Sequence, residues 1–378
     1  MINRTLQGQI ENKFFKNKAI IVIGARQTGK TTLIKSMLDS RKEKTLFFNG
    51  DEADTNDIFD GPTIAKLKGI IRDFQIVFFD EAQKIHNIGT VMKLIVDNFK
   101  DVQVIASGSS SFELMNNLNE PLTGRKYEFH LYPLSYSELA DNFGIVEEKR
   151  NLENRLIFGS YPDIVSSAED AEEHLKLLAG SYLYKDLLML EQIKKPVLLE
   201  KILKALALQI GSEVSYSELG TIVESDKKTV EKYIDLLEKT YIIFRLPALN
   251  KNVRNEIKKG KKIYFYDNGI RNAVISDYRP LAKRTDQGAL WENYLISERL
   301  KFLSISSSGR ESFFWRTTQQ QEVDYIETQY GKYYAYEFKW NPLKKASLSK
   351  TFASGYPDHD FLTVTPDSYR EFLSKDDP

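Results

Sequence analysis

The chain has 378 residues, no cysteine and a formal net charge of zero. This length exceeds a single compact core, so two or three domains are expected. The lack of cysteine excludes disulfide bonds, thiolate zinc sites and cysteine nucleophiles, and the zero net charge excludes a global basic field for nucleic acid. No run approaches the ~18 apolar residues of a membrane span, and Met1–Phe15 lacks the apolar core of a signal peptide. We therefore expect a cytoplasmic protein with no membrane partner.

A strand, a glycine-containing loop and a helix follow one another near the start of the chain. The branched apolar residues Ile20–Ile23 predict a buried parallel strand that ends at Gly24, and a helix begins at Lys30. Four residues separate Gly24 from Gly29, which is followed by Lys30 and Thr31; this is the spacing of a phosphate-binding loop, in the context that the motif requires. Glycine permits a close backbone approach, and free amides at a helix start bind phosphate oxygens. The predicted nucleotide contacts are Gly24, Ala25, Arg26, Gln27, Thr28, Gly29, Lys30, Thr31 and Thr32.

A second buried strand, Gln75–Asp80, ends in two carboxylates, Asp80 and Glu81. Active groups gather at the carboxyl ends of parallel strands, so Asp80 is expected to hold Mg²⁺ together with Thr31. Glu81 is expected to polarise the attacking water, and Lys30 to bridge the β and γ phosphates. ATP with Mg²⁺ is therefore the predicted cofactor.

Three further strands complete the predicted core, at Lys44–Asn49, Val102–Ala106 and Tyr127–Leu131, and residues 1–18 predict a short helix. The strand that ends at Ala106 is followed by Ser107-Gly108-Ser109-Ser110-Ser111. Its polar tip, beginning with Ser107, is a candidate γ-phosphate sensor or a helix N-cap before Phe112.

Arg125 is a candidate arginine finger that acts either in cis or on a neighbouring subunit, which would make the protein a homo-oligomer. A solvated surface arginine is the alternative.

These motifs together resemble a family of prokaryotic AAA-type ATPases in which the ATPase is fused to a C-terminal domain of unknown function. The resemblance implies ATP binding and hydrolysis but leaves the substrate undefined. It covers nearly the whole chain and is carried by Gly24–Thr32, Phe78–Lys84, Ser107–Ser111, Leu122–Arg125, Tyr132–Glu138, Gly159–Pro162, Tyr184–Asp186, Tyr264–Gly269 and Trp291–Asn293.

The middle of the chain favours helices. From Glu148 to Leu206 apolar residues recur at spacings of three and four, as at Leu183, Leu187 and Leu190, which predicts the helical lid of an AAA-type module.

Residues 212–248 then predict a helix–turn–helix–ribbon layout, that of a winged helix. One helix opens at Ser215–Leu219, a second begins with an N-cap at Ser225–Val230, and Ile242–Leu246 is a strand.

In a winged helix, Lys227, Lys228 and Lys232 would face DNA phosphates, with a protein-contact surface as the alternative. The basic stretch Lys251–Lys262 extends the DNA interpretation, or forms a solvated hairpin.

The last third predicts an amphipathic helix at Gly288–Leu295 that presents Glu292, then strands at Phe313–Arg316, Glu322–Ile326, Tyr334–Trp340 and Phe361–Val364. Residues i and i+2 share a strand face, so Glu337 and Lys339 point together, toward Asp324 on the neighbouring strand.

With Glu292, this arrangement of Asp324, Glu337 and Lys339 resembles the core of PD-(D/E)xK nucleases, in which carboxylates bind a divalent metal and the lysine positions water. The alternatives are a salt-bridged sheet face without an ion, or a nuclease fold kept without the reaction.

We therefore predict an α/β protein with a P-loop AAA-type parallel sheet and helical lid, followed by a winged helix and a restriction-endonuclease-like α/β domain. The predicted function is Mg²⁺-dependent ATP hydrolysis whose nucleotide state controls the C-terminal half, with DNA as a candidate partner. One alternative is a nucleotide-dependent signalling switch with a protein-interaction C-terminal half; another is an ATP-coupled, metal-dependent DNA nuclease. The predicted domains are 1–145 (ATPase core), 146–206 (lid), 207–262 (winged-helix-like) and 263–378 (nuclease-like).

Overall fold

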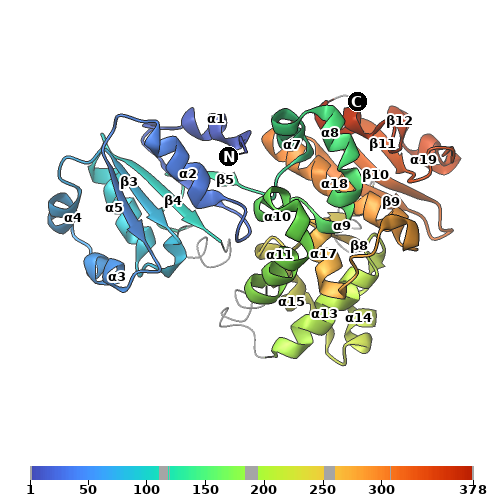
Figure 1. Ribbon diagram of the computed structural model, residues 1–378, viewed down its shortest axis with the longest axis horizontal. Helices are drawn as coiled ribbons and strands as arrows, with labels where there is room; N and C mark the ends of the chain where they lie inside the picture. Colours follow the sequence, from blue (N-terminus) through green and yellow to red (C-terminus); the bar gives the residue numbers. More distant parts are fainter. Residues whose placement is uncertain are drawn as a thin grey trace. The chain divides into compact units, whose positions relative to one another are not determined.

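The computed structural model describes residues 2–376 apart from 110–117, 119, 184–194, 251–259 and 307. It separates into two compact units, Met1–Pro133 and Leu134–Pro378 (Figure 1). The predictions made for Ser110, Ser111, Phe112, Tyr184–Asp186, Leu187, Leu190 and Lys251–Lys259 lie outside the described residues.

The N-terminal unit contains the predicted five-stranded parallel sheet, in the order β2-β3-β4-β1-β5. The central strand β1 pairs with β4 on one side and with β5 on the other, so that Ile20 lies between Ile105 and Tyr127. The strands are β1 (Ala19–Ile23), β2 (Thr45–Asn49), β3 (Ile76–Asp80), β4 (Gln103–Gly108) and β5 (Lys126–His130).

Both faces of this sheet are covered, which explains why β1 and β3 are apolar throughout. Helices α1 (Leu6–Glu11) and α2 (Lys30–Asp39) pack on the face that carries Ile20 and Phe78. Because neighbouring residues of a strand point to opposite faces, Phe79 lies on the other face, where Phe59 of α3 packs edge-on against it with ring centroids 5.3 Å apart. Three helices of this unit were not predicted from the sequence: α3 (Ala53–Phe59), α4 (Ile64–Ile71) and α5 (Ile88–Asn98).

The C-terminal unit begins with helices, and the first of them, at Tyr136–Phe143, precedes the predicted helical region Glu148–Leu206 and lies within the predicted ATPase core. The first helix is held by a capping box, in which the Ser135 side chain accepts from the Glu138 amide and the Glu138 carboxylate accepts from the Ser135 amide. The helices are α7 (Tyr136–Phe143), α8 (Ile145–Arg150), α9 (Leu152–Phe158), α10 (Pro162–Ser166), α11 (Ala171–Leu177), a π-helix (Leu178–Leu183) and α13 (Pro196–Leu208).

The predicted helix–turn–helix region contains α14 (Tyr216–Ile222) and α15 (Lys227–Lys239), whose N-terminal cap is Asp226. Three antiparallel strands accompany the two helices in the order β6-β8-β7; they are β6 (Glu213–Val214), β7 (Ile243–Pro247) and β8 (Lys261–Phe265). Strand β8 spans the predicted domain boundary between residues 262 and 263.

A second, four-stranded sheet has the order β12-β11-β10-β9, with β11 and β12 parallel and the other pairs antiparallel. Its strands are β9 (Glu311–Arg316), β10 (Glu322–Gln329), β11 (Lys332–Phe338) and β12 (His359–Val364). This part of the chain also contains helices α17 (Asn268–Ile275), α18 (Gln287–Ile305), α19 (Lys350–Gly355) and α20 (Tyr369–Ser374), of which α17 packs against α9 and α13.

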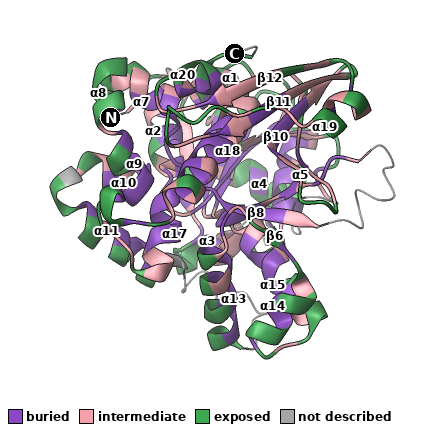
Figure 2. Cartoon of the chain, turned by 90° about the vertical axis from the view of Figure 1, so that its right-hand side faces the viewer, coloured by how far each residue is buried: buried purple, intermediate pink, exposed green. Residues whose placement is uncertain are grey.

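The prediction that residues 288–295 form an amphipathic helix was wrong in one respect, because α18 is buried around most of its surface (Figure 2). It contacts β8, β11, α9, α17 and α20, so little of it is left for solvent. Its polar residues are paired inside the protein; Arg299, for example, donates to both carboxylate oxygens of Glu327, at 2.6 and 2.8 Å. None of the described helices is both long and apolar enough to cross a membrane.

Candidate functional site

The loop between β1 and α2 depends on its two glycines. A Cβ at Gly24 would lie 2.0 Å from the carbonyl oxygen of Leu131, and Gly29 has a φ of +90°, which side-chain-bearing residues rarely adopt. Lys30 is 5 % exposed, and its Nζ donates to the carbonyl oxygens of Gly24 and Ala25 at 3.0 and 2.8 Å. The ammonium group therefore lies inside the loop that is predicted to bind phosphates.

The remaining predicted contacts follow the same loop. Arg26 and Gln27 are partly exposed, and Gln27 has a φ of +60°. The Thr28 hydroxyl donates to the Ala25 carbonyl at 2.8 Å, and Thr32 is exposed in the first turn of α2.

Two strand ends and the start of α2 bring two hydroxyl groups and a carboxylate together beside the loop. The Thr31 hydroxyl hydrogen-bonds to Oδ1 and Oδ2 of Asp80 at 3.0 and 2.9 Å, and the Ser107 hydroxyl donates to Asp80 Oδ1. Because β4 lies between β1 and β3, Ser107 reaches Asp80 from the neighbouring strand. A hard oxygen pair of this kind, next to a phosphate-binding loop, fits Mg²⁺.

Glu81 lies just beyond β3 with a φ of +47°, an unusual value for a side-chain-bearing residue. Its Oε2 accepts from Gln83 Nε2 at 2.6 Å and from the Ser109 hydroxyl at 3.3 Å. Gln83 Oε1 is buried and has no hydrogen-bond partner within the described part of the chain. Gln83 was not predicted as an orienting residue, although it belongs to the Phe78–Lys84 motif.

Arg125 lies at the amino-terminal ends of the strands, whereas the phosphate loop follows the carboxyl-terminal end of β1. Its carbonyl accepts from the amide of Ala19, the first residue of β1, and its Nε donates to Asp97 Oδ1 at 2.7 Å. The loop begins after the other end of β1, about 16 Å away at ~3.3 Å per residue. The cis role therefore does not fit this geometry, and a role on a neighbouring subunit stays a prediction.

The structure brings Asp324, Glu337 and Lys339 into contact, and Glu292 lies near enough to interact electrostatically with Asp324 and Lys339. Lys339 Nζ lies 2.6 Å from Glu337 Oε2 and 3.8 Å from Asp324 Oδ2. Asp324 Oδ2 also accepts from the Phe338 amide at 2.8 Å. Burial, together with the nearby Asp324 carboxylate, raises the pKa of Glu337 to about 7.

Glu292 has a different partner, which the sequence analysis missed. Lys262 of β8 is 2 % exposed, and its Nζ lies 3.1 Å from Glu292 Oε1 and 2.5 Å from Glu322 Oε1. The Tyr264 hydroxyl donates to the same Glu292 oxygen at 2.5 Å. Burial alone would lower the pKa of Lys262, but the carboxylates of Glu292 and Glu322 outweigh it and raise that pKa.

Glu292, Asp324, Glu337 and Glu322 thus form an acidic cluster. Two lysine ammonium groups, those of Lys262 and Lys339, form ion pairs with its carboxylates. Among the described residues, no group of three or more His, Asp or Glu side chains is arranged to hold a metal ion. The predicted DNA-facing residues Lys227, Lys228 and Lys232 are exposed on α15.

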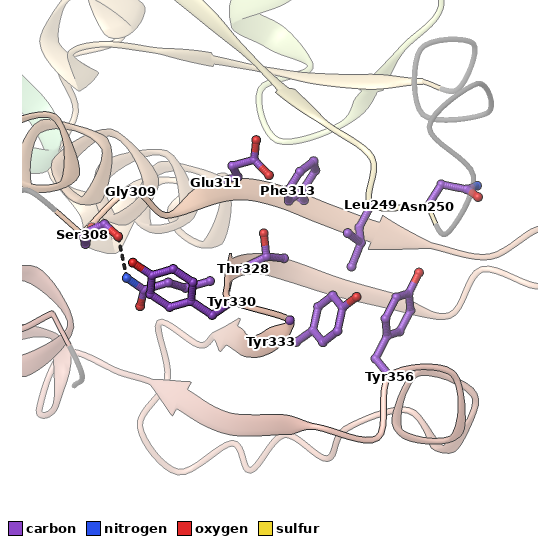
Figure 3. Close-up of a pocket in the computed structure, with 12 residues that line it drawn as sticks. Leu249, Asn250, Ser308, Gly309, Glu311, Phe313, Thr328, Tyr330, Tyr333 and Tyr356 are labelled. Atoms are coloured by element: carbon purple, nitrogen blue, oxygen red, sulfur yellow. Dashed lines mark hydrogen bonds between the residues drawn. The ribbon is translucent and has the colours of Figure 1, made fainter.

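A cavity of about 570 Å³ lies at another part of the four-stranded sheet (Figure 3). Tyr333 and Tyr356 lie side by side in it, with ring centroids 4.8 Å apart, and Glu311 lines it from β9. Among the described residues that line this cavity, Glu311 is the charged one and there is no lysine or arginine. Its chemistry therefore does not favour the phosphates of a nucleic acid.

Three family models match separate parts of the chain. Residues 16–140 match the family described as AAA domain. Residues 149–280 and 287–371 match two families described as domains of unknown function, DUF8612 and DUF4143.

The similar proteins extend over most of the chain. An uncharacterized protein of Mycobacterium tuberculosis is 25% identical over 362 residues, covering 94% of this chain and 77% of that protein. An uncharacterized protein of Haemophilus influenzae is 22% identical over 328 residues, covering 81% and 78%. The structure of the Walker-type ATPase paby2304 of Pyrococcus abyssi has a TM-score of 0.50 at 16% identity, and the likeness covers 73% of this chain and 96% of that chain. Residues 16–140 are thus similar to AAA domains, and the fold resembles that of a Walker-type ATPase. The winged-helix and nuclease-like assignments stay predictions.

Proposed function

We propose that the N-terminal unit binds ATP with Mg²⁺ and hydrolyses it. The observation that supports this most is the hydrogen-bonded group of Thr31, Asp80 and Ser107 beside a loop that already holds the Lys30 ammonium. Thr31 and Asp80 would hold Mg²⁺, which when bound would neutralise phosphate charge. Phosphate release from ATP by the full chain, with and without Mg²⁺, tests the proposal.

Glu81 is the proposed base. Its free carboxylate oxygen accepts a proton from water, while Gln83 and Ser109 hold the other oxygen in place. The buried, unpartnered Oε1 of Gln83 is suited to accept a second hydrogen bond from the same water. Lys30 would leave the two loop carbonyls and pair with phosphate oxygens, which exchanges neutral acceptors for charged ones.

We propose that Arg125 acts as an arginine finger between two copies of the chain. Phosphate release per subunit is then expected to rise with protein concentration, and Arg125→Ala is expected to keep ATP affinity but lose that rise. The matched variant is Asp97→Ala, which removes the ion-pair partner of Arg125 and leaves the guanidinium in place. If Arg125 is only structural, both variants will match each other and turnover per subunit will not depend on concentration.

A second candidate function concerns the C-terminal unit, which we propose binds a divalent metal through Asp324 and Glu337 in support of DNA cleavage controlled by the nucleotide state. The close approach of Lys339 to both carboxylates supports it, because this is the residue set that such a reaction requires. Glu292 would join only if it gave up its pairing with Lys262. In the rival function the same unit binds a protein partner as part of a nucleotide-dependent switch.

The metal proposal predicts Mn²⁺ binding that depends on Asp324. In a Lys30→Ala background, which silences the ATP site, calorimetric titration is expected to show one C-terminal site that Asp324→Ala removes. Because the pKa of Glu337 is about 7, its carboxylate is mostly protonated at pH 6 and ionised at pH 8, so affinity is expected to rise by about tenfold over this range.

Asp360→Ala is the matched control, because Asp360 is an exposed carboxylate on β12 that pairs with Lys332. Identical titrations of the Asp324→Ala and parent proteins would remove the metal site. Metal binding without cleavage of plasmid DNA, and without DNA binding that weakens as salt rises, would favour the protein-binding switch.

A further inference from the structure

Arg4 connects the phosphate loop to the chain that leaves the N-terminal unit. Its Nη1 donates to the carbonyl oxygen of Thr28 at 2.7 Å, and its Nη2 donates to the carbonyl oxygen of Tyr132 at 2.6 Å. Thr28 lies in the phosphate loop, whereas Tyr132 follows β5 and precedes Pro133, the last residue of the unit. One side chain thus joins two backbone segments, at positions 28 and 132, that are 104 residues apart in the sequence.

The position of Arg4 is set by packing rather than by the loop itself. It directly precedes the cap of α1, whose buried Leu6 and Ile10 belong to the same apolar cluster as Leu33 and Ile34 of α2. Since α2 begins at the phosphate loop, α1 holds Arg4 at the N-terminal end of that helix. A Cβ at Gly29 would lie 3.9 Å from Arg4 Nη1, which places the guanidinium against the loop.

Arginine suits this place better than other cations. Its planar guanidinium presents donors on separate nitrogens, so it can serve two carbonyl oxygens at once, and it stays charged. Lysine has one nitrogen, which serves two carbonyl oxygens only where both converge on it, as those of Gly24 and Ala25 do at Lys30. The positive charge also adds to the field that attracts phosphate.

A second contact ties the same two segments together. The Leu131 amide donates to the carbonyl of Ile23 at 2.7 Å, and Gly24 packs directly against the Leu131 carbonyl. The loop is therefore held at its start by Leu131 and near its end by Arg4, and both contacts involve the segment 131–132.

We propose that Arg4 is a positioning residue that holds the phosphate loop in its binding conformation and transmits nucleotide occupancy to residues 131–132. The proposal rests on the proposed ATP function. When phosphates draw the loop amides and Lys30 toward them, a displacement of the Thr28 carbonyl reaches the Tyr132 carbonyl through the rigid guanidinium. The AAA match begins at residue 16, so Arg4 lies outside it.

The test compares Arg4→Ala, Arg4→Lys and wild type in the full chain. Arg4→Ala is expected to raise the KM for ATP by about tenfold, the loss expected for charge-assisted hydrogen bonds, with a smaller change in kcat. Hydrogen–deuterium exchange of peptides that cover 130–136, with and without a non-hydrolysable ATP analogue, reports transmission. In wild type, the analogue is expected to change the exchange rate of these peptides; in Arg4→Ala, even saturating analogue is expected to leave it unchanged. Arg4→Lys is expected to recover more of the ATP affinity than of this analogue-dependent change in exchange.

Arg41→Ala is the matched control, because Arg41 is a partly buried arginine of the same unit that pairs with Glu43 and packs over Phe14. It is expected to retain the wild-type KM and exchange response. If Arg4→Ala does not fold, the Arg4→Lys variant tests the proposal by itself. If the analogue changes exchange in Arg4→Lys as it does in wild type, the two-carbonyl mechanism is wrong. A wild-type protein that binds no nucleotide would instead refute the proposed ATP function, and a normal KM and response in Arg4→Ala would refute this inference alone.

Discussion

Glu81→Gln is expected to keep ATP binding and to lower phosphate release by about 10²–10⁴-fold, the usual contribution of a general base. Glutamine has nearly the shape of glutamate but cannot accept the proton that water must lose. Its amide can still contact Gln83 and Ser109, which hold Glu81 Oε2 at 2.6 and 3.3 Å, so the φ of +47° at this position need not change. The loss should therefore fall on kcat and leave affinity in place.

The measurement is steady-state phosphate release together with binding of a fluorescent ATP analogue. Glu52→Gln is the matched control, because Glu52 is an exposed carboxylate of the same unit whose side chain makes no capping hydrogen bond. Wild-type turnover in Glu81→Gln would assign the base to another residue.

Lys30→Ala is expected to weaken ATP binding by at least ~100-fold, which corresponds to the loss of a charged contact with phosphate. Lys30 is buried, and its ammonium already lies within 3.0 Å of two carbonyl oxygens of the loop. The loop amides that would remain are neutral, and Arg26 of the loop is partly exposed, so neither replaces the buried ammonium group.

Equilibrium binding of ATP measures this effect, and thermal unfolding without nucleotide shows whether the variant is folded. The matched control is Lys35→Ala, on the same helix, where the ammonium lies over the Phe47 ring, 4.4 Å from its centroid. If Lys30→Ala bound ATP as tightly as wild type, the loop would not be the nucleotide site.

The motif around Arg125 does not define where this residue lies relative to the phosphate loop. The sequence places Arg125 next to the strand at Lys126–His130, and both cis and trans roles were open. The sheet places Arg125 away from the loop because all its strands are parallel, so their amino ends lie together at the end opposite the loop. The finger role on a neighbouring subunit stays a prediction. Strand order and direction depend on pairing between distant segments, which local residue types do not specify.

In the acidic cluster, too, some contacts follow from local alternation and others depend on distant elements. Alternation along the predicted strand Tyr334–Trp340 placed Glu337 and Lys339 near Asp324, because residues i and i+2 share a face. The ion pairs of Lys339 with both carboxylates agree with this, although β11 itself ends at Phe338. Alternation could not reveal that Lys262 of β8 pairs with Glu292 of α18, since those elements meet only when the helix is buried between β8 and other elements. The helix was expected to be amphipathic for the same reason: its polar residues find partners, such as Glu327 for Arg299, only in the tertiary structure.

The sequence by itself determined the strand–loop–helix around Gly24 and Lys30 and the strand that ends at Asp80 and Glu81, because torsional freedom, apolar periodicity and helix starts are properties of neighbouring residues. Only the tertiary structure decided which groups complete these segments. Gln83 and Ser109 beside Glu81, Lys262 beside Glu292, and Arg4 between the Thr28 and Tyr132 carbonyls depend on contacts made by chain folding. Buried donors and acceptors must find partners wherever the fold brings them, and sequence distance does not limit that search.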